Sequence, residues 1–198
     1  PSLGKVARFT REGNVLPALV SRGQLARPIA VAVDEHNGNV LVLDKLYNHI
    51  VEFTRLGSVA SIIEPRRVQS MSAIAVGRGG IYVIDNTSNQ VVMLNRDGSS
   101  RKVIRTELPE YPDSVAVNRD NLLFVSDSYD DSVKVYDLTG FEKGSFLGKV
   151  GGLGGLGIER FNGIDGLAIE DDTLFVADSM NGRIQTLLIN SSANVVGR

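Results

Sequence analysis

The sequence contains no cysteine and no tryptophan, and only two of its 198 residues are histidine. Without cysteine, the chain cannot form disulfides, thiolate metal sites or cysteine nucleophiles. With only His36 and His49 available, a zinc site or a Ser-His-Asp arrangement has almost no candidates. No apolar run approaches the roughly 18 residues that a membrane helix needs, so we expect no membrane span. Exported and cytosolic proteins can both lack cysteine, so the compartment stays open.

Charge is unevenly distributed along the chain, although the formal net charge is only −2. Lysine and arginine outnumber the acids in residues 1–105, which carry +6, whereas residues 106–198 carry −8. Two halves of opposite sign can indicate two partners, or like chains that meet head to tail. The simpler interpretation is that this difference in charge is random variation among solvated surface residues. The acidic second half and a pI near 5.7 argue against nucleic acid as the partner.

Four aliphatic segments of the same design each end in aspartate. They are Val40–Asp44, Ile81–Asp85, Leu123–Asp127 and Leu174–Asp178. The closing aspartates follow one another after 41, 42 and 51 residues. A period of this size is typical of a repeat architecture.

Each repeat contains up to four short runs with strand composition, separated by turn residues. The complete repeats are expected at about 28–63, 71–105, 113–147 and 164–196, and residues 5–20 form half a repeat. No segment longer than about ten residues has helical periodicity, so we expect essentially no helix. Four-stranded units at this period predict an all-β propeller of antiparallel blades. Asn37-Gly38 predicts a two-residue type I′ turn inside the first complete repeat.

Three segments of the first complete repeat, in order, resemble the NHL repeat. They are Pro28–Asp34, Val40–Asp44 and Asn48-His49-Ile50-Val51. The fourth repeat is the closest match, with Phe161-Asn-Gly followed by Val176-Ala-Asp178-Ser-Met-Asn181-Gly-Arg183-Ile184. The resemblance covers almost the whole chain, and it implies a propeller, usually of six blades, that serves as a binding platform. The second and third repeats depart from the pattern at Gln90 and at Asp131-Ser132.

The number of repeats predicts one domain, or a fragment of one, with about four and a half blades. An open arc leaves two apolar blade faces without neighbours, because a blade is built to be buried on both sides. Further blades of the same protein, a second copy or another protein would cover these faces. Further blades are favoured, because the sequence begins midway through a repeat.

Two sets of polar residues recur at the same place in the repeats, and we interpret them as structural turn residues. They are Asp44, Asp85, Asp127 and Asp178, together with Asn48, Asn89 and Asn181. Aspartate commonly accepts N–H bonds in its own turn, and one site does not need four copies. Residues 152–157 match G-x-G-x-x-G, but a strand follows instead of a helix, so we expect no bound nucleotide and no other cofactor.

One group of aromatic and arginine residues indicates a recognition surface rather than internal packing. In an up-and-down blade, the turns after the second strands and the connections between blades lie on one face. This face is expected to collect aromatic and arginine side chains, which dominate interface hot spots. They are Arg22, Arg27, Tyr47, Arg66, Arg67, Tyr111, Tyr129, Arg160 and Phe161. Packing of the aromatic residues within their own loops is the alternative.

These observations predict a non-catalytic binding or assembly scaffold that recognises a protein or another ligand. One alternative is an NHL propeller that binds RNA on a basic face, as some tripartite-motif proteins do. The resemblance also admits a metal-dependent lactonase or lyase, because six-bladed propellers host these with a central ion. Such an ion needs several oxygen or imidazole ligands. The innermost strands offer mostly Ala, Val and Ile, and Asp113 and Asp165 are the only acids near their start, so we expect no metal and no catalytic residue.

Overall fold

Antiparallel strands form nearly all of the regular structure. The computed structural model describes residues 4–20, 23–104, 111–139, 144–152, 154–189 and 195–197, the last range by its backbone alone. One short 3₁₀ turn, η1 (Ser179–Asn181), is the only helical element within these ranges. None of the described residues therefore forms a helix with the length and apolar character to cross a membrane.

Four four-stranded sheets follow one another along the chain, and we call them blades 1 to 4. Blade 1 contains β3 (Pro28–Val33), β4 (Val40–Asp44), β5 (His49–Phe53) and β6 (Val59–Ile63). Blade 2 contains β7 (Met71–Gly77), β8 (Gly80–Asp85), β9 (Gln90–Leu94) and β10 (Ser100–Ile104). Blade 3 contains β11 (Pro112–Val117), β12 (Leu122–Asp127), β13 (Ser132–Asp137) and β14 (Ser145–Gly151). Blade 4 contains β15 (Ile164–Glu170), β16 (Thr173–Asp178), β17 (Arg183–Ile189) and β18 (Val195–Gly197).

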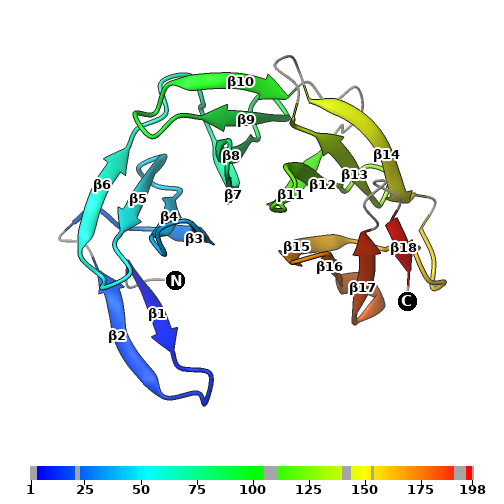
Figure 1. Ribbon diagram of the computed structural model, residues 1–198, viewed down its shortest axis with the longest axis horizontal. Coiled ribbons are helices and arrows are strands. Elements are labelled where there is room, and N and C mark those ends of the chain that lie inside the picture. Colours follow the sequence, from blue (N-terminus) through cyan, green and yellow to red (C-terminus); the bar gives the residue numbers. More distant parts are fainter. Residues whose placement is uncertain are drawn as a thin grey trace.

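A two-stranded sheet precedes blade 1, and we call it the half-blade. It pairs β1 (Lys5–Phe9) with β2 (Val15–Val20). The blades are arranged around a centre, with β3, β7, β11 and β15 innermost and β6, β10 and β14 along the periphery (Figure 1). The arc is open between the half-blade and blade 4 (Figure 1). This is the arrangement of β-propeller blades, so the predicted fold class is confirmed.

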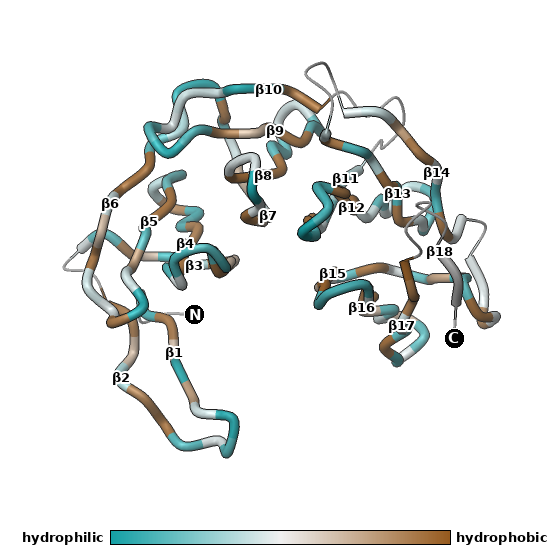
Figure 2. The backbone as a smooth tube through the Cα atoms, in the orientation of Figure 1, coloured by the Kyte–Doolittle hydropathy of each residue, from teal (hydrophilic) through white to brown (hydrophobic). Residues whose placement is uncertain are grey.

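The second strand of blades 1 to 3 is apolar on both faces, because each of these three blades packs against two neighbours. In β4, Leu41 and Leu43 pack toward blade 2, whereas Val42 packs toward the half-blade. Strands buried on both faces read as continuous aliphatic runs rather than as alternating ones. In Figure 2 the hydrophobic segments lie along the strands of the blades, whereas the tips of several hairpins are hydrophilic.

The core is divided into layers between neighbouring sheets. Separate apolar clusters join the half-blade to blade 1 and join each blade to the next. The innermost strands contribute small side chains to these clusters, such as Ala30 and Ala32 of β3 and Ala116 of β11. Small residues fit there because the blades converge toward the centre.

The hairpin between β3 and β4 differs from the predicted two-residue turn. Gly38 has φ +73°, but Asn37 does not have the positive φ that a type I′ turn requires. The N–H of Gly38 instead donates to the carbonyl oxygen of Asp34 at 2.7 Å, which closes a longer loop. The side chain of Asp34 also accepts the N–H of His36 at 3.0 Å. This local bond favours the longer loop over the tight turn.

Candidate recognition face

The turn after the second strand of blade 1 is held by one buried carboxylate. Asp44 is fully buried, and its Oδ1 accepts the N–H groups of Leu46 at 2.9 Å and Tyr47 at 3.1 Å. Its Oδ2 accepts the N–H groups of Ala26 and Arg27, both at 2.6 Å. Asp44 therefore fixes its own turn and also ties it to the connection that leads into blade 1.

The other blades repeat this bridge. Asp85 accepts the N–H groups of Ser70 at 3.1 Å and Thr87 at 3.2 Å. Asp127 accepts the N–H groups of Tyr111 at 3.2 Å and Tyr129 at 3.0 Å. In each case one donor belongs to the turn and the other to the connection before the innermost strand. We call the surface formed by these turns and connections the turn face.

Blade 4 adds side-chain donors to the same bridge. Asp178 accepts the N–H of Asn162 at 2.7 Å, and it also accepts bonds from the side chains of Asn181, Arg183 and Gln185. Burial alone would raise the pKa of Asp178, but these bonds together outweigh that effect and hold the pKa below its ordinary value. The carboxylate is thus kept charged although it is buried.

The residue that ends the turn connects one blade to the next. Asn48 has φ +51°, and its side chain donates to the carbonyl of Val68 at 2.8 Å and accepts the N–H of Met71 at 3.0 Å. Asp131 has the same place in blade 3 and accepts the N–H of Gly163 at 2.9 Å. Asn48 therefore holds the connection to blade 2 rather than its own turn.

The remaining predicted asparagines do not all have equivalent places. Asn89 shares the place and the left-handed backbone of Asn48, with φ +51°. Asn181 lies one position earlier in its turn, where Gly182 takes the left-handed conformation with φ +61°. The side chain of Asn181 donates to Asp178 and to the carbonyl of Gly155.

Three predicted tyrosines lie exposed on the turn face. Tyr47 is 50% exposed, Tyr111 54% and Tyr129 64%. The rings of Tyr111 and Tyr129 are 6.2 Å apart between centroids, and the Tyr47 ring is 5.3 Å from that of His49. The N–H of each tyrosine donates to a buried aspartate, so a rigid backbone presents the ring to solvent.

Four of the predicted arginines are also exposed in connections of this face. They are Arg27, Arg66, Arg67 and Arg160. Arg22 lies outside the described residues. His49 is buried and its Nε2 is 2.7 Å from the carbonyl of Gln24, a contact that holds the connection into blade 1.

Phe161 does not belong to the turn face, contrary to the expectation from its place in a connection. It is 0% exposed and packs in the apolar cluster between blades 3 and 4. A Cβ atom added at Gly151 would lie 2.5 Å from the Phe161 ring, which shows how closely the outer strand of blade 3 covers it. The aromatic ring is removed from solvent because this connection folds back over the core.

Sequence reasoning missed four large apolar side chains on the turn face, each between 66% and 78% exposed. They are Leu46, Leu156, Ile158 and Met180. Leu46 and Met180 occupy the second position after the closing aspartate, as Tyr129 does in blade 3. At this position the N–H of Leu46 and of Tyr129 faces the aspartate, so the side chain points outward. When the repeats are aligned on their closing aspartates, the second position after each aspartate therefore predicts an exposed side chain.

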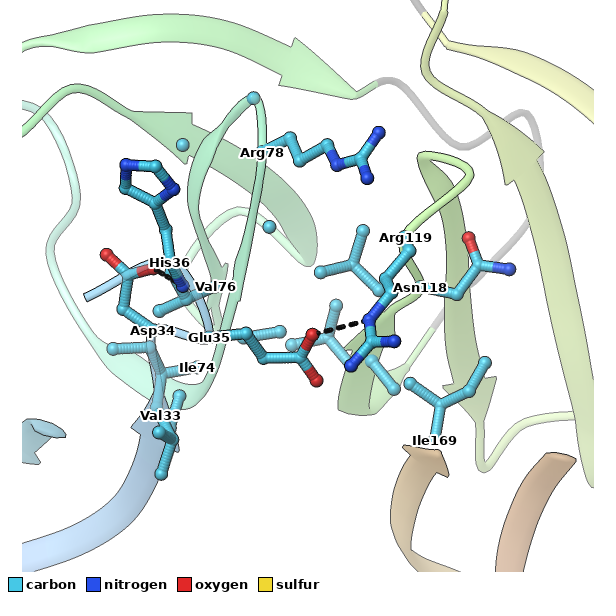
Figure 3. Close-up of a pocket in the computed structure, with 18 of the residues that line it drawn as sticks. Val33, Asp34, Glu35, His36, Ile74, Val76, Arg78, Asn118, Arg119 and Ile169 are labelled. Atoms are coloured by element: carbon cyan, nitrogen blue, oxygen red, sulfur yellow. Dashed lines mark hydrogen bonds and ion pairs between the residues drawn. The ribbon is translucent and has the colours of Figure 1, made fainter. Parts of the chain in front are cut away.

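The blades surround a central channel, and its end opposite the turn face is lined by aliphatic and charged side chains. A cavity of about 1120 Å³ lies between the innermost strands and the hairpins that follow them. Its walls are aliphatic, but charged side chains such as Glu35, Arg78 and Arg119 surround it (Figure 3). The Arg119 guanidinium donates to Glu35 at 2.8 Å and to Asp171 at 3.2 Å, and so links blades 1, 3 and 4.

The carboxylates around this cavity are engaged by arginine. Arg96 pairs with Asp34 and Glu52, and Arg119 pairs with Glu35 and Asp171. Across the residues that the structure describes, no three His, Asp or Glu side chains form a group suited to a metal ion. Asp113 and Asp165 are exposed at the start of their innermost strands, away from these arginine pairs. The described residues around the channel therefore bring together no ligand set of this kind.

No protein-family model matches the sequence, and no curated protein matches it significantly. Solved structures match its fold. A functionally unknown protein from Desulfotomaculum acetoxidans has a TM-score of 0.72 and 14% identity, over 100% of this chain and 63% of its own. Virginiamycin B lyase from Staphylococcus aureus has a TM-score of 0.66 and 13% identity, over 98% of this chain and 62% of its own.

A protein of unknown function from Bacteroides caccae has a TM-score of 0.63 and 15% identity, over 98% of this chain and 68% of its own. At such identities the likeness shows a β-propeller and nothing about the ligand. The chain spans about two thirds of the length of each of these three proteins.

Proposed function

We propose that this chain is a non-catalytic recognition module of NHL type that binds a protein partner through its turn face. The observation that carries the proposal is the concentration of exposed large apolar side chains on this face. Tyr47, Tyr111 and Tyr129 share it with Leu46, Leu156, Ile158 and Met180. Exposed apolar patches of this kind mark interaction sites, and tyrosine is a preferred anchor.

The rigid backbone of the turn face supports the same proposal. Asp44 and Asp127 hold the N–H groups of all three tyrosines, so little backbone order has to be gained on binding. Pre-organised anchors bind more tightly because they lose less conformational entropy. The hairpins on the opposite side carry mainly charged side chains, such as Glu35, Arg119 and Asp171.

The experiment compares capture of partners by the unmodified protein and by variants. Tyr47→Ser with Tyr129→Ser removes two anchors from the turn face, and we expect the captured protein to be lost. Leu56→Ser is the matched control, because Leu56 is 82% exposed on the turn between β5 and β6. Retention of the same protein by the tyrosine variant would contradict the proposal. Specific binding of a divalent ion in the central channel, with loss after Glu35→Gln, would favour the enzyme alternative.

A further inference from the structure

The half-blade lacks the two inner strands that blades 1 to 4 possess. Its strands β1 and β2 correspond to the third and fourth strands of a blade, because Phe9-Thr-Arg-Glu-Gly13 recurs in blade 1 as Phe53-Thr-Arg-Leu-Gly57. The turns in these two segments also have the same backbone bonds, since Gly13 donates to Thr10 and Gly57 to Thr54. Within the part of the chain that the structure describes, β1 pairs with β2 alone, so its edge toward the centre of the arc is open (Figure 1).

The missing strands leave apolar side chains of β3 uncovered. Val31 of blade 1 has the same place as Ile74 of blade 2 and Val115 of blade 3, because each lies opposite a valine of its second strand. Ile74 is 7% exposed and Val115 5%, since the inner strands of the preceding blade pack against them. Val31 is 54% exposed, and Val33, the next side chain on that face, is 55% exposed. An inner pair of strands is thus what buries this surface in the complete blades.

We call the space between the open edge of β1 and the exposed Val31 and Val33 the strand slot. Its outer wall is already a packed interface, in which Val6 and Leu19 of the half-blade join the cluster that contains Phe53 of blade 1. A pair of strands in the slot would therefore extend an existing core rather than create a new one. Residues 1–3 lie outside the described residues, and three residues are too few to supply two strands of five or six residues, the lengths of β4 and β3.

Lys5 marks the register of the strand that fits this open edge. In the complete blades the closing aspartate lies opposite the first residue of the third strand, as Asp44 does to His49 and Asp178 to Arg183. In blade 4 the Arg183 guanidinium donates to Asp178 at 2.7 Å. Lys5 has this place in the half-blade, where it is exposed and forms no ion pair with any described residue. The undescribed residues closest to β1 and β2 in the sequence, 1–3 and 21–22, contain no acid. A second strand that ends in aspartate would therefore place a carboxylate opposite this cation.

We propose that the strand slot receives a β-hairpin from further propeller sequence of the same protein, and that this hairpin completes the half-blade. Its first strand covers Val31 and Val33, and its second strand is aliphatic, pairs with β1 and ends in an aspartate opposite Lys5. Backbone bonds to an open strand edge supply affinity, and the alternate side chains supply specificity. The solved propellers that match nearly all of this chain have the length for such a hairpin, since the chain spans only 62–68% of them.

The probe is the amidated peptide Pro112–Asp127, which has the sequence of the inner strand pair of blade 3 and is added to the complete chain. In blade 3 this pair packs Ala116 and Phe124 toward blade 4, and in the slot the same side chains would cover Val31 and Val33. We expect the peptide to bind, as measured by the anisotropy of a fluorescent label on it. Amide hydrogen exchange should become slower in β1 and stay unchanged in β13, which is paired on both edges.

Variants of the chain and of the peptide locate the contact. Val31→Lys should weaken binding at least about tenfold, because it places an amine in an apolar interface. Ile184→Lys is the matched control, since Ile184 is 65% exposed on the uncovered face of blade 4, and it should leave binding unchanged. Lys5→Gln and the peptide change Asp127→Asn should each weaken binding about two- to fivefold, the range of an exposed ion pair. Combined, they should weaken it no more than either alone.

A fusion covers the case of a peptide that is disordered when free. Placing Pro112–Asp127 directly before Pro1 leaves four residues between the aspartate and Lys5, the same number as between β4 and β5. The fusion should raise the melting temperature by at least about 3 °C, because it buries the apolar surface of the slot. Val31→Lys in the fusion should remove that rise.

The inference is overturned if the peptide does not bind and the fusion melts no higher than the chain. Equal weakening by Val31→Lys and Ile184→Lys, or unchanged exchange in β1 with the peptide bound, would also overturn it. Protection of β1 that grows with the concentration of the chain alone, and that the peptide does not increase, would assign the slot to a second copy instead. Tyr47→Ser with Tyr129→Ser should leave peptide binding unchanged, so the turn-face proposal and this inference can fail separately.

Discussion

The rings of Tyr111 and Tyr129 lie 6.2 Å apart between centroids with an interplanar angle of 35°, although one residue precedes β11 and the other follows β12. Both of their N–H groups donate to Oδ1 of Asp127. A further backbone bond joins the N–H of Ser128 to the carbonyl of Tyr111 at 3.0 Å. The backbone, rather than packing around the rings, thus holds the pair in place.

The tyrosine pair should contribute little to stability. Tyr111→Ala with Tyr129→Ala should lower the free energy of unfolding by less than about 1 kcal/mol, because both rings are largely exposed. Phe161→Ala, which empties a fully buried site, should cost about 3–5 kcal/mol. Urea unfolding followed by circular dichroism measures both. A comparable loss in the two variants would mean that the tyrosines pack against the fold.

Asp127 should contribute far more to the free energy of unfolding than its neighbours on the turn face. Lys134 forms an ion pair with Asp127, and both side chains are buried. Asp127→Asn removes the carboxylate charge beside this lysine, and among the described residues the longer contact to Asp130 is then its remaining ion pair. We therefore expect a loss of about 3–5 kcal/mol in the free energy of unfolding. Adding Lys134→Met should recover part of the loss, because the uncompensated charge is then removed.

Asp120→Asn is the control for this pair, since Asp120 is exposed in the hairpin between β11 and β12. It should change the free energy of unfolding by less than about 0.5 kcal/mol. A double variant that is no more stable than Asp127→Asn alone would show that the lost turn bonds, not the lysine charge, determine the cost.

Two glycines with left-handed backbones allow steric contact to be separated from backbone strain. Gly151 has φ +85° and would place a Cβ 2.5 Å from the Phe161 ring and 2.7 Å from the carbonyl oxygen of Asp131. Gly182 has φ +61° and nothing within 4 Å of that position. Gly182→Ala should therefore cost only about 1–2 kcal/mol, the penalty of the left-handed backbone. Gly151→Ala should cost clearly more in thermal unfolding, and similar melting temperatures would contradict the geometry.

Much of the fold could be predicted because a propeller blade is specified locally. The run Val40–Asp44 is apolar, β-branched in part and closed by an aspartate, and it forms β4 with these same bounds. The hairpin at Asn37-Gly38 could not be predicted in the same way. There the side chain of Asp34 competes for the local N–H groups, and the dipeptide alone does not reveal this bond.

The candidate site was less predictable, because exposure depends on how a connection folds back. Tyr111 and Phe161 both lie before an innermost strand, yet only Tyr111 is exposed. The difference comes from the close approach of Gly151, at the end of β14, to Phe161 in the connection into blade 4. Leu46 and Met180 are harder to predict for another reason, because their exposure depends on a position in the turn, the second after the closing aspartate, and not on the residue type.

Acid should weaken blade 4 through Asp178. Burial raises the pKa of this carboxyl, but the bonds from Asn181, Arg183 and the surrounding donors outweigh it, so the folded-state pKa lies below the ordinary value of 3.8. A group with a lowered folded-state pKa stabilises the protein above its ordinary pKa and loses that contribution as pH falls through the folded value.

Asp178→Asn removes the titrating group and should flatten the dependence of unfolding free energy on pH between about pH 5 and pH 2. Glu12→Gln is a useful comparison, because Glu12 also has a lowered pKa, caused by a hydrogen bond with Thr10, but lies fully exposed in the half-blade. Glu12→Gln should change the pH dependence of the unfolding free energy less than Asp178→Asn does. Unchanged acid sensitivity in Asp178→Asn would place the acid-labile group elsewhere.

The uncovered sheet faces should make the isolated chain associate. On blade 1, Val31 and Val33 are 54% and 55% exposed on the side away from blade 2, and on blade 4 Ile184 is 65% exposed. Apolar surfaces of this kind are seldom left in water. The opposite charges of the two halves of the sequence would favour contact between the basic end of one chain and the acidic end of another.

Sedimentation at increasing concentration should accordingly give masses above the 21.3 kDa of one chain, with association weakening as salt rises. Val31→Lys with Ile184→Lys should shift the population toward 21.3 kDa, because each lysine places a charge on an uncovered face. Leu56→Lys is the control, since Leu56 is exposed on a turn and not on a sheet face. If the unmodified chain sediments as a monomer at every concentration, the exposed faces do not drive association. The partner of the turn face would then have to be sought independently of them.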